Sequence, residues 1–266
     1  MKAALKRGVK SVLTATGRTS VATRVLTYHS IGLRRHDMNV TLDNFERQMA
    51  WLAEHAEIID LDYAISGRPG VAITFDDGFE DNLRNAAPVL QRHGFPATLF
   101  FVSGRCGGYL DDEPDPEHGR IMDWDQLRAW REQGLHVGGH TRSHPKLAQL
   151  DTAAQRGEIA GCKADIENAL GEAVPHFAYP YGSAWDYTEQ SVALAQEAGY
   201  AAAFSNRYGP CVPGDGPYQF RRIWIDATDT LPAFAAKVTG KLDSLRHLEG
   251  PAALALRRTL NRLTSR

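Results

Sequence analysis

Seven short runs of apolar and β-branched residues recur along the chain, and a helical or loop stretch follows each of them. The runs cover residues 24–29, 71–76, 96–102, 135–139, 176–180, 200–204 and 220–226. Strands that alternate with helices predict parallel β-α-β units, and runs this apolar fit strands that are covered on both faces. A doubly wound sheet would give the same alternation. We interpret the pattern as an α/β barrel of seven strands.

Helical stretches with clear start or stop signals separate several of these runs. Thr41 can cap a helix over residues 41–52, where apolar residues repeat at i, i+4 and i+7 spacing. Residues 83–94 repeat that pattern and end in His-Gly, which is a helix-stop signature. A further helix is expected to open at Asp123 and to close at residues 133–134.

Composition limits the class of protein and its organisation. No Pro- or Ser-rich linker divides residues 24–245, so we expect one domain there, with a basic extension at 1–23 and a basic helix or tail at 246–266. The three cysteines are far apart and odd in number, which excludes a disulfide scaffold and a CxxC zinc site. The whole chain carries a net charge of −2, which excludes bulk cationic attraction to nucleic acid.

The two ends of the chain are basic and contain no acidic residue at 1–24 or 251–266. Polar residues interrupt the apolar run at 9–16, so we expect no secretory signal and a cytoplasmic protein. Leu256, Leu260 and Leu263 form one helical stripe, and such a basic helix can lie on an anionic membrane surface. It would hold the protein at the inner face of the membrane. Solvated tails, or a helix packed on the barrel, are the alternatives.

Three polar clusters lie where predicted strands end. They are Asp76-Asp77-Gly78, the histidines at 140 and 144, and the aromatic turn at 177–182. Taken alone, the first is ordinary turn chemistry, the second is common surface sequence, and the third fits core plus turn. Two histidines four residues apart can also converge on one face of a helical turn, which suits a metal.

Together the three clusters predict a catalytic site. In parallel α/β architectures the loops that follow the strands share one face, where ligand sites form. One carboxylate and two imidazoles leave a coordination position open for water, which is typical of catalytic rather than structural zinc sites. The neighbouring carboxylate would be within reach of that water as a general base. The combination predicts metal-assisted hydrolysis.

These motifs resemble those of the polysaccharide deacetylases of carbohydrate esterase family four, which share the chitooligosaccharide deacetylase homology domain. Residues 74–78 match the first motif of the family, and residues 140–144 match the second. Residues 177–182 look like the third motif of an exopolysaccharide-deacetylase-like subgroup. The resemblance spans residues 24–245 and implies a distorted (β/α)7 barrel.

The resemblance also implies roles for individual residues. Asp76 is the expected catalytic base, and Asp77, His140 and His144 are the expected ligands of a divalent metal. The metal is usually Zn²⁺, with Co²⁺, Ni²⁺ or Mn²⁺ as alternatives. The backbone N–H of Tyr181 would stabilise the oxyanion.

Two departures from the family pattern require replacements. Where many members have an arginine that orients the catalytic aspartate, this chain has Tyr179. Arg222, in the last predicted strand, would reach the same face and supply the charge, unless it forms a surface salt bridge. The late histidine that normally acts as general acid is also missing, because His247 at the far edge of the domain is the only histidine after residue 205.

The string at 27–31 offers a replacement for that acid. It resembles the opening strand of the biofilm-polysaccharide deacetylases, whose barrel is circularly permuted relative to the usual family order and whose acid lies on that strand. We therefore expect His29 to be the acid, although a histidine at a strand end is usually satisfied by a backbone carbonyl. Trp185 would stack on a sugar ring or pack at a helix start.

The expected function is hydrolysis of an acetamido group on an amino sugar, which yields an amine and acetate. The substrate would be an N-acetylated polysaccharide, oligosaccharide or lipid-linked glycan. Two other classes stay open: an amidase that acts on a non-sugar C–N bond on the same barrel, and a catalytically silent glycan-binding module. The intact carboxylate and histidine motifs count against the silent module. The oligomeric state is left open.

Overall fold

The computed structural model of the chain describes residues 19–249, in which seven parallel strands close into a barrel. The strands are β1 (Arg24–Tyr28), β2 (Val71–Phe75), β3 (Thr98–Phe101), β4 (His136–Gly139), β5 (His176–Ala178), β6 (Ala202–Tyr208) and β7 (Phe220–Trp224). Each strand pairs in parallel with the next along the chain, and β7 returns to pair with β1. This closure confirms the seven-stranded barrel and excludes the doubly wound sheet.

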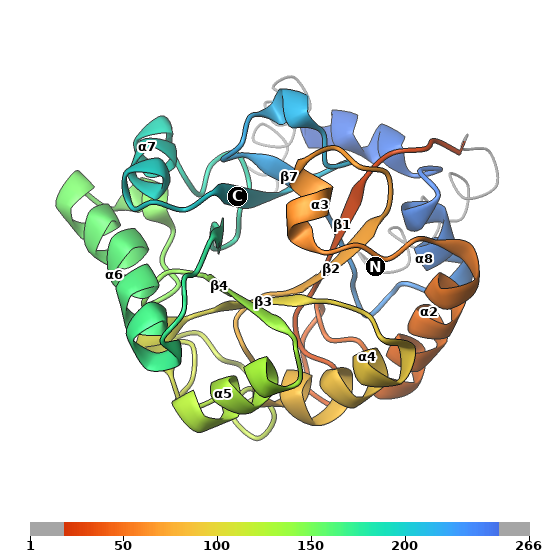
Figure 1. Cartoon of the computed structure of the whole chain (residues 1–266), viewed down its shortest axis with the longest axis horizontal. Coiled ribbons are helices and arrows are strands. Elements are labelled where there is room, and N and C mark those ends of the chain that lie inside the picture. The colour runs from red at the N-terminus through yellow and green to blue at the C-terminus, as the bar shows by residue number, and fades with distance from the viewer. Residues whose placement is uncertain (1–18, 250–266) are drawn as a thin grey trace, which may run out of the picture.

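Helices surround the strands on the outside of the barrel (Figure 1). The α-helices are α2 (Leu42–His55), α3 (Leu61–Ile65), α4 (Ala87–His93), α5 (Trp124–Glu132), α6 (Thr152–Leu170), α7 (Glu189–Glu197) and α8 (Leu231–Val238). Short 3-10 turns span Ser103–Arg105, Leu147–Gln149, Pro213–Asp215 and Asp243–Glu249. The predicted helix starts are confirmed, because Thr41 and Asp123 cap α2 and α5 with their side chains. The expected helix at 83–94 begins instead as a π-helix, Asn82–Ala86, which runs into α4.

Side chains alternate between the barrel interior and the layer under the helices, because successive residues of a strand face opposite sides. On β2, Phe75 packs against Phe45 of α2 with ring centroids 6.0 Å apart, whereas Ala72, three residues earlier on the opposite face, belongs to the inner cluster. That inner cluster contains Val25, Ala72, Phe100, Ala202, Phe204 and Phe220. Gly138 makes room for it, since a Cβ there would lie 2.5 Å from the ring of Phe100.

The two ends of the barrel are closed differently. At the amino end, Leu61 of α3 joins the inner cluster and lies near Thr98 and His176, the first residues of β3 and β5. At the carboxyl end, the loops that follow the strands carry the polar clusters found in the sequence. The inner apolar cluster therefore lies between α3 at the amino end and the polar clusters at the carboxyl end.

The acidic segment at 107–119 is anchored rather than free in solvent. Glu113 forms a buried ion pair with Arg34 at 2.8 Å, and the backbone N–H of Arg35 donates to Asp115 at 2.7 Å. These two buried acids therefore attach the segment to the loop that follows β1.

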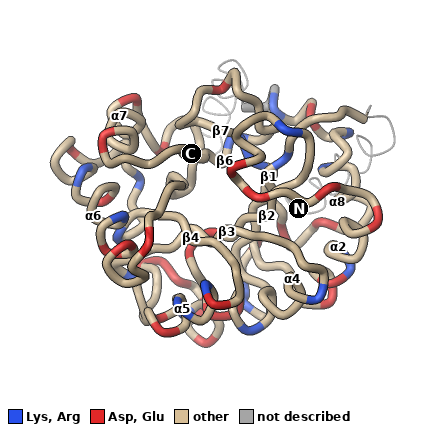
Figure 2. Tube along the Cα trace, in the orientation of Figure 1, with Lys and Arg blue, Asp and Glu red and all other residues tan. Residues whose placement is uncertain are grey.

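Acidic and basic residues are interspersed over the outer helices and loops (Figure 2). Residues 1–18 and 250–266, which hold most of the basic extensions and the leucine stripe, lie outside the described residues. The first described residues run along the barrel, where the N–H of Ser20 donates to the carbonyl of Thr239 at 2.9 Å. The domain limits at 23 and 246 stay a prediction.

Within residues 19–249, no helix combines the length and the apolar character needed to cross a lipid bilayer.

Candidate active site

Asp77, His140 and His144 converge at the carboxyl end of the barrel. Oδ1 of Asp77 lies 3.5 Å from Nε2 of His140 and 3.3 Å from Nε2 of His144. This oxygen is buried and has no hydrogen-bond partner among the described residues. A buried carboxylate oxygen between two imidazole nitrogens would be satisfied by a divalent cation, so the three residues fit the donor set of a catalytic metal site.

The protonation states of the three side chains suit metal binding. Burial lowers the pKa of His140 to about 3 and that of His144 to about 4, so both imidazoles are neutral at pH 7. Nδ1 of His140 donates to the carbonyl of Ala178 at 2.8 Å, which leaves Nε2 as the nitrogen that faces Asp77. Burial raises the pKa of Asp77 to about 6, and its carboxylate is still ionised at pH 7.

The two histidines meet through a loop and not through a helical turn. Thr141 and His144 both have left-handed backbones, with φ of 64° and 61°, and residues 140–146 contain no helix. The helical-turn prediction is therefore wrong, because left-handed residues cannot continue an α-helix. The N–H of His144 instead donates to the hydroxyl of Thr141 at 3.0 Å, and the two imidazole centroids lie 5.1 Å apart.

Asp76, the neighbour of Asp77, binds Arg222 inside the barrel. Nη1 and Nη2 of Arg222 donate to Oδ1 and Oδ2 of Asp76 at 2.7 Å and 2.8 Å, and both side chains are buried. The alternative of a surface salt bridge is thereby excluded. Burial alone would raise the pKa of Asp76, but the charge and hydrogen bonds of Arg222, together with His140, hold that pKa well below its usual range.

His29 follows β1 at the same end of the barrel. Burial lowers its pKa, while the charges of Asp77 and Asp76 oppose that shift, so the imidazole lies within electrostatic range of both carboxylates. Its Nδ1 is buried and has no hydrogen-bond partner in the described part of the chain. The backbone carbonyl of His29 accepts from Asn82 at 2.7 Å, and Asn82 begins the π-helix, an element frequent at functional sites.

Tyr181 and Trp185 lie on the loop that follows β5. The ring of Tyr181 packs against His144 with centroids 4.8 Å apart, and its backbone is left-handed with φ of 58°. Among residues 19–249, the N–H of Tyr181 donates to no other group. Trp185 is 48% exposed and lies farther out, beside Asp186, which pairs with Lys146 near the Tyr181 ring. Trp185 lies three residues before Thr188, the N-cap of α7, and its role stays a prediction from the sequence.

Several supporting groups at this site were missed by the sequence analysis. They include backbone carbonyls, such as those of Ala178 and Ser205, which accept from His140 and Arg222. Backbone groups have no residue signature, so no sequence signal pointed to them. Asn82 is a polar residue four positions after the Asp-Asp-Gly motif, and this closeness to the motif was the sequence signal that could have indicated its supporting role.

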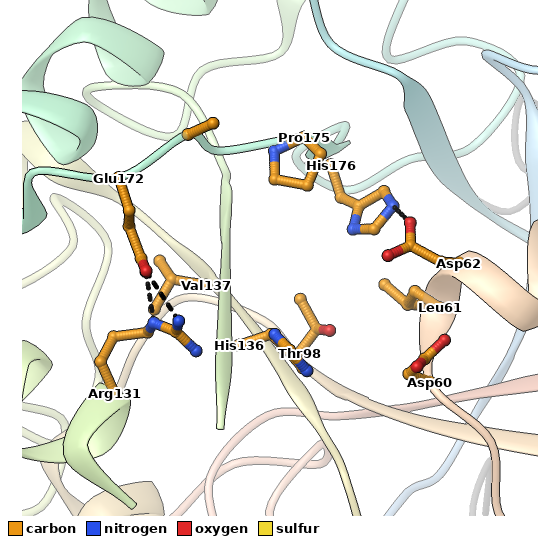
Figure 3. A pocket seen from close by; sticks show the side chains of 11 residues that line it. Asp60, Leu61, Asp62, Thr98, Arg131, His136, Val137, Glu172, Pro175 and His176 are labelled. Atoms are coloured by element: carbon orange, nitrogen blue, oxygen red, sulfur yellow. Dashed lines mark hydrogen bonds and ion pairs between the residues drawn. The ribbon is translucent and has the colours of Figure 1, made fainter. Parts of the chain in front are cut away.

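A cavity lies at the opposite end of the barrel (Figure 3). It has a volume of about 120 Å³ and opens beside Thr98, His136 and His176, the first residues of β3, β4 and β5. His176 pairs with Asp62 on one side and Arg131 pairs with Glu172 on the other (Figure 3). None of the predicted site residues lines this cavity.

A model of the polysaccharide deacetylase family matches residues 65–203, just over half of the chain. The chain belongs to the polysaccharide deacetylase family. This membership confirms the predicted family and the predicted class of enzyme, a deacetylating hydrolase. The matched segment contains the Asp76-Asp77 pair and the two histidines of the second motif, but neither His29 nor Arg222.

Individual relatives extend the similarity over most of the chain. YxkH of Bacillus subtilis (strain 168), whose name assigns it to the same family, is 26% identical over 80% of this chain and 75% of its own length. A chitooligosaccharide deacetylase of Bradyrhizobium sp. (strain ANU 289) is 30% identical over 52% of this chain and 56% of its own length. The structure of IcaB from Ammonifex degensii superposes with a TM-score of 0.72 at 25% identity, over 84% of this chain and all of that one.

Proposed function

We propose that this polysaccharide deacetylase hydrolyses the acetamido group of an amino sugar in an N-acetylated polysaccharide, oligosaccharide or lipid-linked glycan, and that it requires a divalent metal, with Zn²⁺ first among the candidates. One observation carries the proposal. The Oδ1 atom of Asp77 is buried and unpartnered between two neutral imidazoles, and a second carboxylate, clamped by Arg222, follows the same strand. The chitooligosaccharide deacetylase among the relatives supports an amino-sugar substrate.

The residues divide the reaction between them. A metal held by Asp77, His140 and His144 would polarise the amide carbonyl and lower the pKa of water towards ~7. Asp76 accepts the proton of the attacking water, since Arg222 keeps its carboxylate ionised at neutral pH. The N–H of Tyr181 donates to the oxyanion that develops on the substrate.

The remaining two residues act on the leaving group and on the sugar. His29 protonates the departing amine, and its burial makes the imidazolium form a stronger acid than in water. Trp185 offers an exposed aromatic face, which suits the apolar face of a sugar ring. A cytoplasmic location and contact of the basic termini with anionic membrane stay predictions from the sequence.

Metal removal and replacement tests the proposal. The chelated full chain should release no acetate from β-1,4- or β-1,6-linked N-acetylglucosamine oligomers, and added Zn²⁺ or Co²⁺ should restore the release. His140→Ala should not recover with Zn²⁺ at the wild-type concentration, because it lacks one ligand. Full activity after chelation would contradict the proposal.

The same assay separates the two alternatives. Turnover of a cyclic ureide or a formamide, with none of the oligomers, would identify an amidase for non-sugar C–N bonds. Binding of the oligomers without turnover in the Zn²⁺-loaded protein would identify a silent glycan-binding module.

A further inference from the structure

Two carboxylates of the outer helix α6 bind the loop that carries His140 and His144: Asp165 binds the side chain of Arg142, and Glu158 binds the backbone. Oε2 of Glu158 accepts hydrogen bonds from the backbone N–H groups of Arg142 at 2.8 Å and Ser143 at 2.9 Å. Oε1 of Glu158 accepts from the hydroxyl of Ser143 at 2.7 Å. Successive N–H groups that converge in this way form an anion-binding concavity, and the anion here is the side chain of Glu158.

The backbone of this loop is one that needs support. Thr141 and His144 are both left-handed, and a β-branched residue such as threonine rarely adopts that conformation. Such backbones persist only where the surrounding structure determines them. The N–H groups of Ser103 and Gly104 donate hydrogen bonds to the carbonyls of Thr141 and Arg142 in this loop. Glu158 accepts from the N–H groups of Arg142 and Ser143, which lie between the two histidines.

We propose that Glu158 is a positioning residue for the metal site. Its carboxylate keeps the loop in the conformation that directs Nε2 of His140 and Nε2 of His144 at Asp77. The inference rests on the proposed function, since it takes these three residues to be metal ligands. Glu158 acts through the backbone of the loop and touches none of the three.

The same helix provides a matched control. Oε1 of Glu167 accepts from the backbone N–H of Val174 at 3.0 Å and from Nζ of Lys163 at 2.6 Å. Glu167 therefore also ties α6 to a backbone N–H, but at the segment before β5 rather than at the histidine loop. Loss of either glutamate should weaken the attachment of α6, and only loss of Glu158 should disturb the metal site.

The experiment titrates the metal-free full chain with Zn²⁺ in competition with a chromophoric chelator, and it measures Tm of the metal-free proteins in parallel. Glu158→Ala should lower the Zn²⁺ affinity by about 10- to 100-fold, whereas Glu167→Ala should change it by less than about twofold. Both variants should lower Tm. Glu158→Gln should bind Zn²⁺ within about threefold of wild type, because its amide oxygen can still accept from both N–H groups and the Ser143 hydroxyl can reverse its role.

Two outcomes would overturn the inference while leaving the proposed function standing. Equal Zn²⁺ affinity of wild type and Glu158→Ala is one, and equal losses in Glu158→Ala and Glu167→Ala are the other, since either means that Glu158 only attaches the helix. If Glu158→Ala does not fold, Glu158→Asp should show the same loss, because the shorter side chain cannot reach both N–H groups. A wild-type chain that binds no Zn²⁺ would overturn the metal site itself and the proposed function with it.

Discussion

The two ends of the barrel each place a buried histidine beside an aspartate, but only the carboxyl end buries the aspartate as well. There the Asp77 side chain is 6% exposed and lies between two histidines. At the amino end, Nε2 of His176 lies 3.2 Å from Oδ1 of Asp62, whose side chain is 75% exposed. Water solvates Asp62 directly, whereas Asp77 keeps an oxygen that no described protein group satisfies.

The difference shows that burial, more than residue type, decides whether the aspartate of such a pair is satisfied by water or is left available for a ligand. An exposed ion pair contributes roughly 0–1 kcal/mol because water and salt compete for both charges. A buried carboxylate without a partner is costly, so it persists where a ligand or a strong counter-charge compensates it. At the carboxyl end, Arg222 compensates Asp76, and Asp77 is left available for a metal.

Removing one carboxylate at each end should give the largest contrast. Asp76→Asn should lower turnover by about 10²- to 10⁴-fold while Zn²⁺ still binds, because the variant loses the base but no metal ligand. Asp62→Asn should leave turnover within about twofold, since Asp62 is exposed and lies at the opposite end of the barrel from the candidate site. Acetate release at saturating Zn²⁺ and Zn²⁺ titration measure the two effects. Full turnover in Asp76→Asn would show that another group is the base.

Breaking the buried ion pair should produce the next largest effect, this time on stability. Arg222→Met should lower the free energy of unfolding by about 3–5 kcal/mol, because it leaves Asp76 buried without its counter-charge. Adding Asp76→Asn to Arg222→Met should recover part of this loss, since neither charge of the pair then remains. Urea unfolding at pH 7 measures both variants. A double variant no more stable than the single one would contradict this account.

Arg222→Met should also change how stability and kcat/KM depend on pH. Because Arg222 holds the pKa of Asp76 below that of an unfolded aspartate, the pair stabilises the fold above about pH 4, and this stabilisation is lost as the pH falls further. In Arg222→Met the pKa of Asp76 should rise. The acid limb of kcat/KM should therefore move to higher pH, provided that the variant keeps measurable turnover.

The barrel was predictable from the sequence because each buried strand leaves a compact apolar run. The exception is β6, predicted at 200–204 but observed at Ala202–Tyr208. Its second half contains Ser205, Asn206 and Arg207, and these polar residues end the apolar run although the strand continues. Strand pairing to β7 supports the extension, since Tyr208 is in register with Arg222.

The site was predictable where its residues are close in sequence and less so where they are not. Asp76 and Asp77 are adjacent, and the two histidines share one loop, so local motifs revealed them. The pairing of Asp76 with Arg222 joins residues 146 positions apart and depends on closure of the barrel. The bonds of Glu158 to the histidine loop depend on how α6 packs, and no local pattern encodes that.

His29 provides a narrower test of the carboxyl end. His29→Gln should lower turnover of an N-acetylglucosamine oligomer by at least about 10²-fold, because the leaving amine needs a proton. It should change turnover of 4-nitrophenyl acetate by less than about threefold, because that leaving group departs without one. Zn²⁺ affinity serves as the control and should be unchanged. Equal losses on the amide and the ester would show that His29 does not act as the acid.

The smallest expected effect concerns His176 at the amino end, where two influences on its pKa oppose each other. Burial lowers the pKa of His176, while the charge of Asp62 raises it, and burial prevails. Nearby, His136 also lowers the pKa of His176 and Asp60 also raises it. The folded chain therefore binds this proton less readily than the unfolded chain. Stability should fall as the pH decreases below about 6.5, by at most about 1.4 kcal/mol per pH unit.

His176→Asn should remove this dependence, so the difference in stability between wild type and variant should itself change with pH. The free energies of unfolding of wild type and variant are measured in urea between pH 7.5 and 5.5. As the pH falls over this range, wild type should lose stability relative to the variant, by less than about 1 kcal/mol. Subtracting the two curves cancels the contributions of the histidines at the carboxyl end, which both proteins share. If the difference instead shifts in favour of wild type at low pH, the ion pair with Asp62 outweighs burial. The amino end would then hold a charged histidine, and the contrast with the neutral imidazoles of the carboxyl end would be sharper than burial alone predicts.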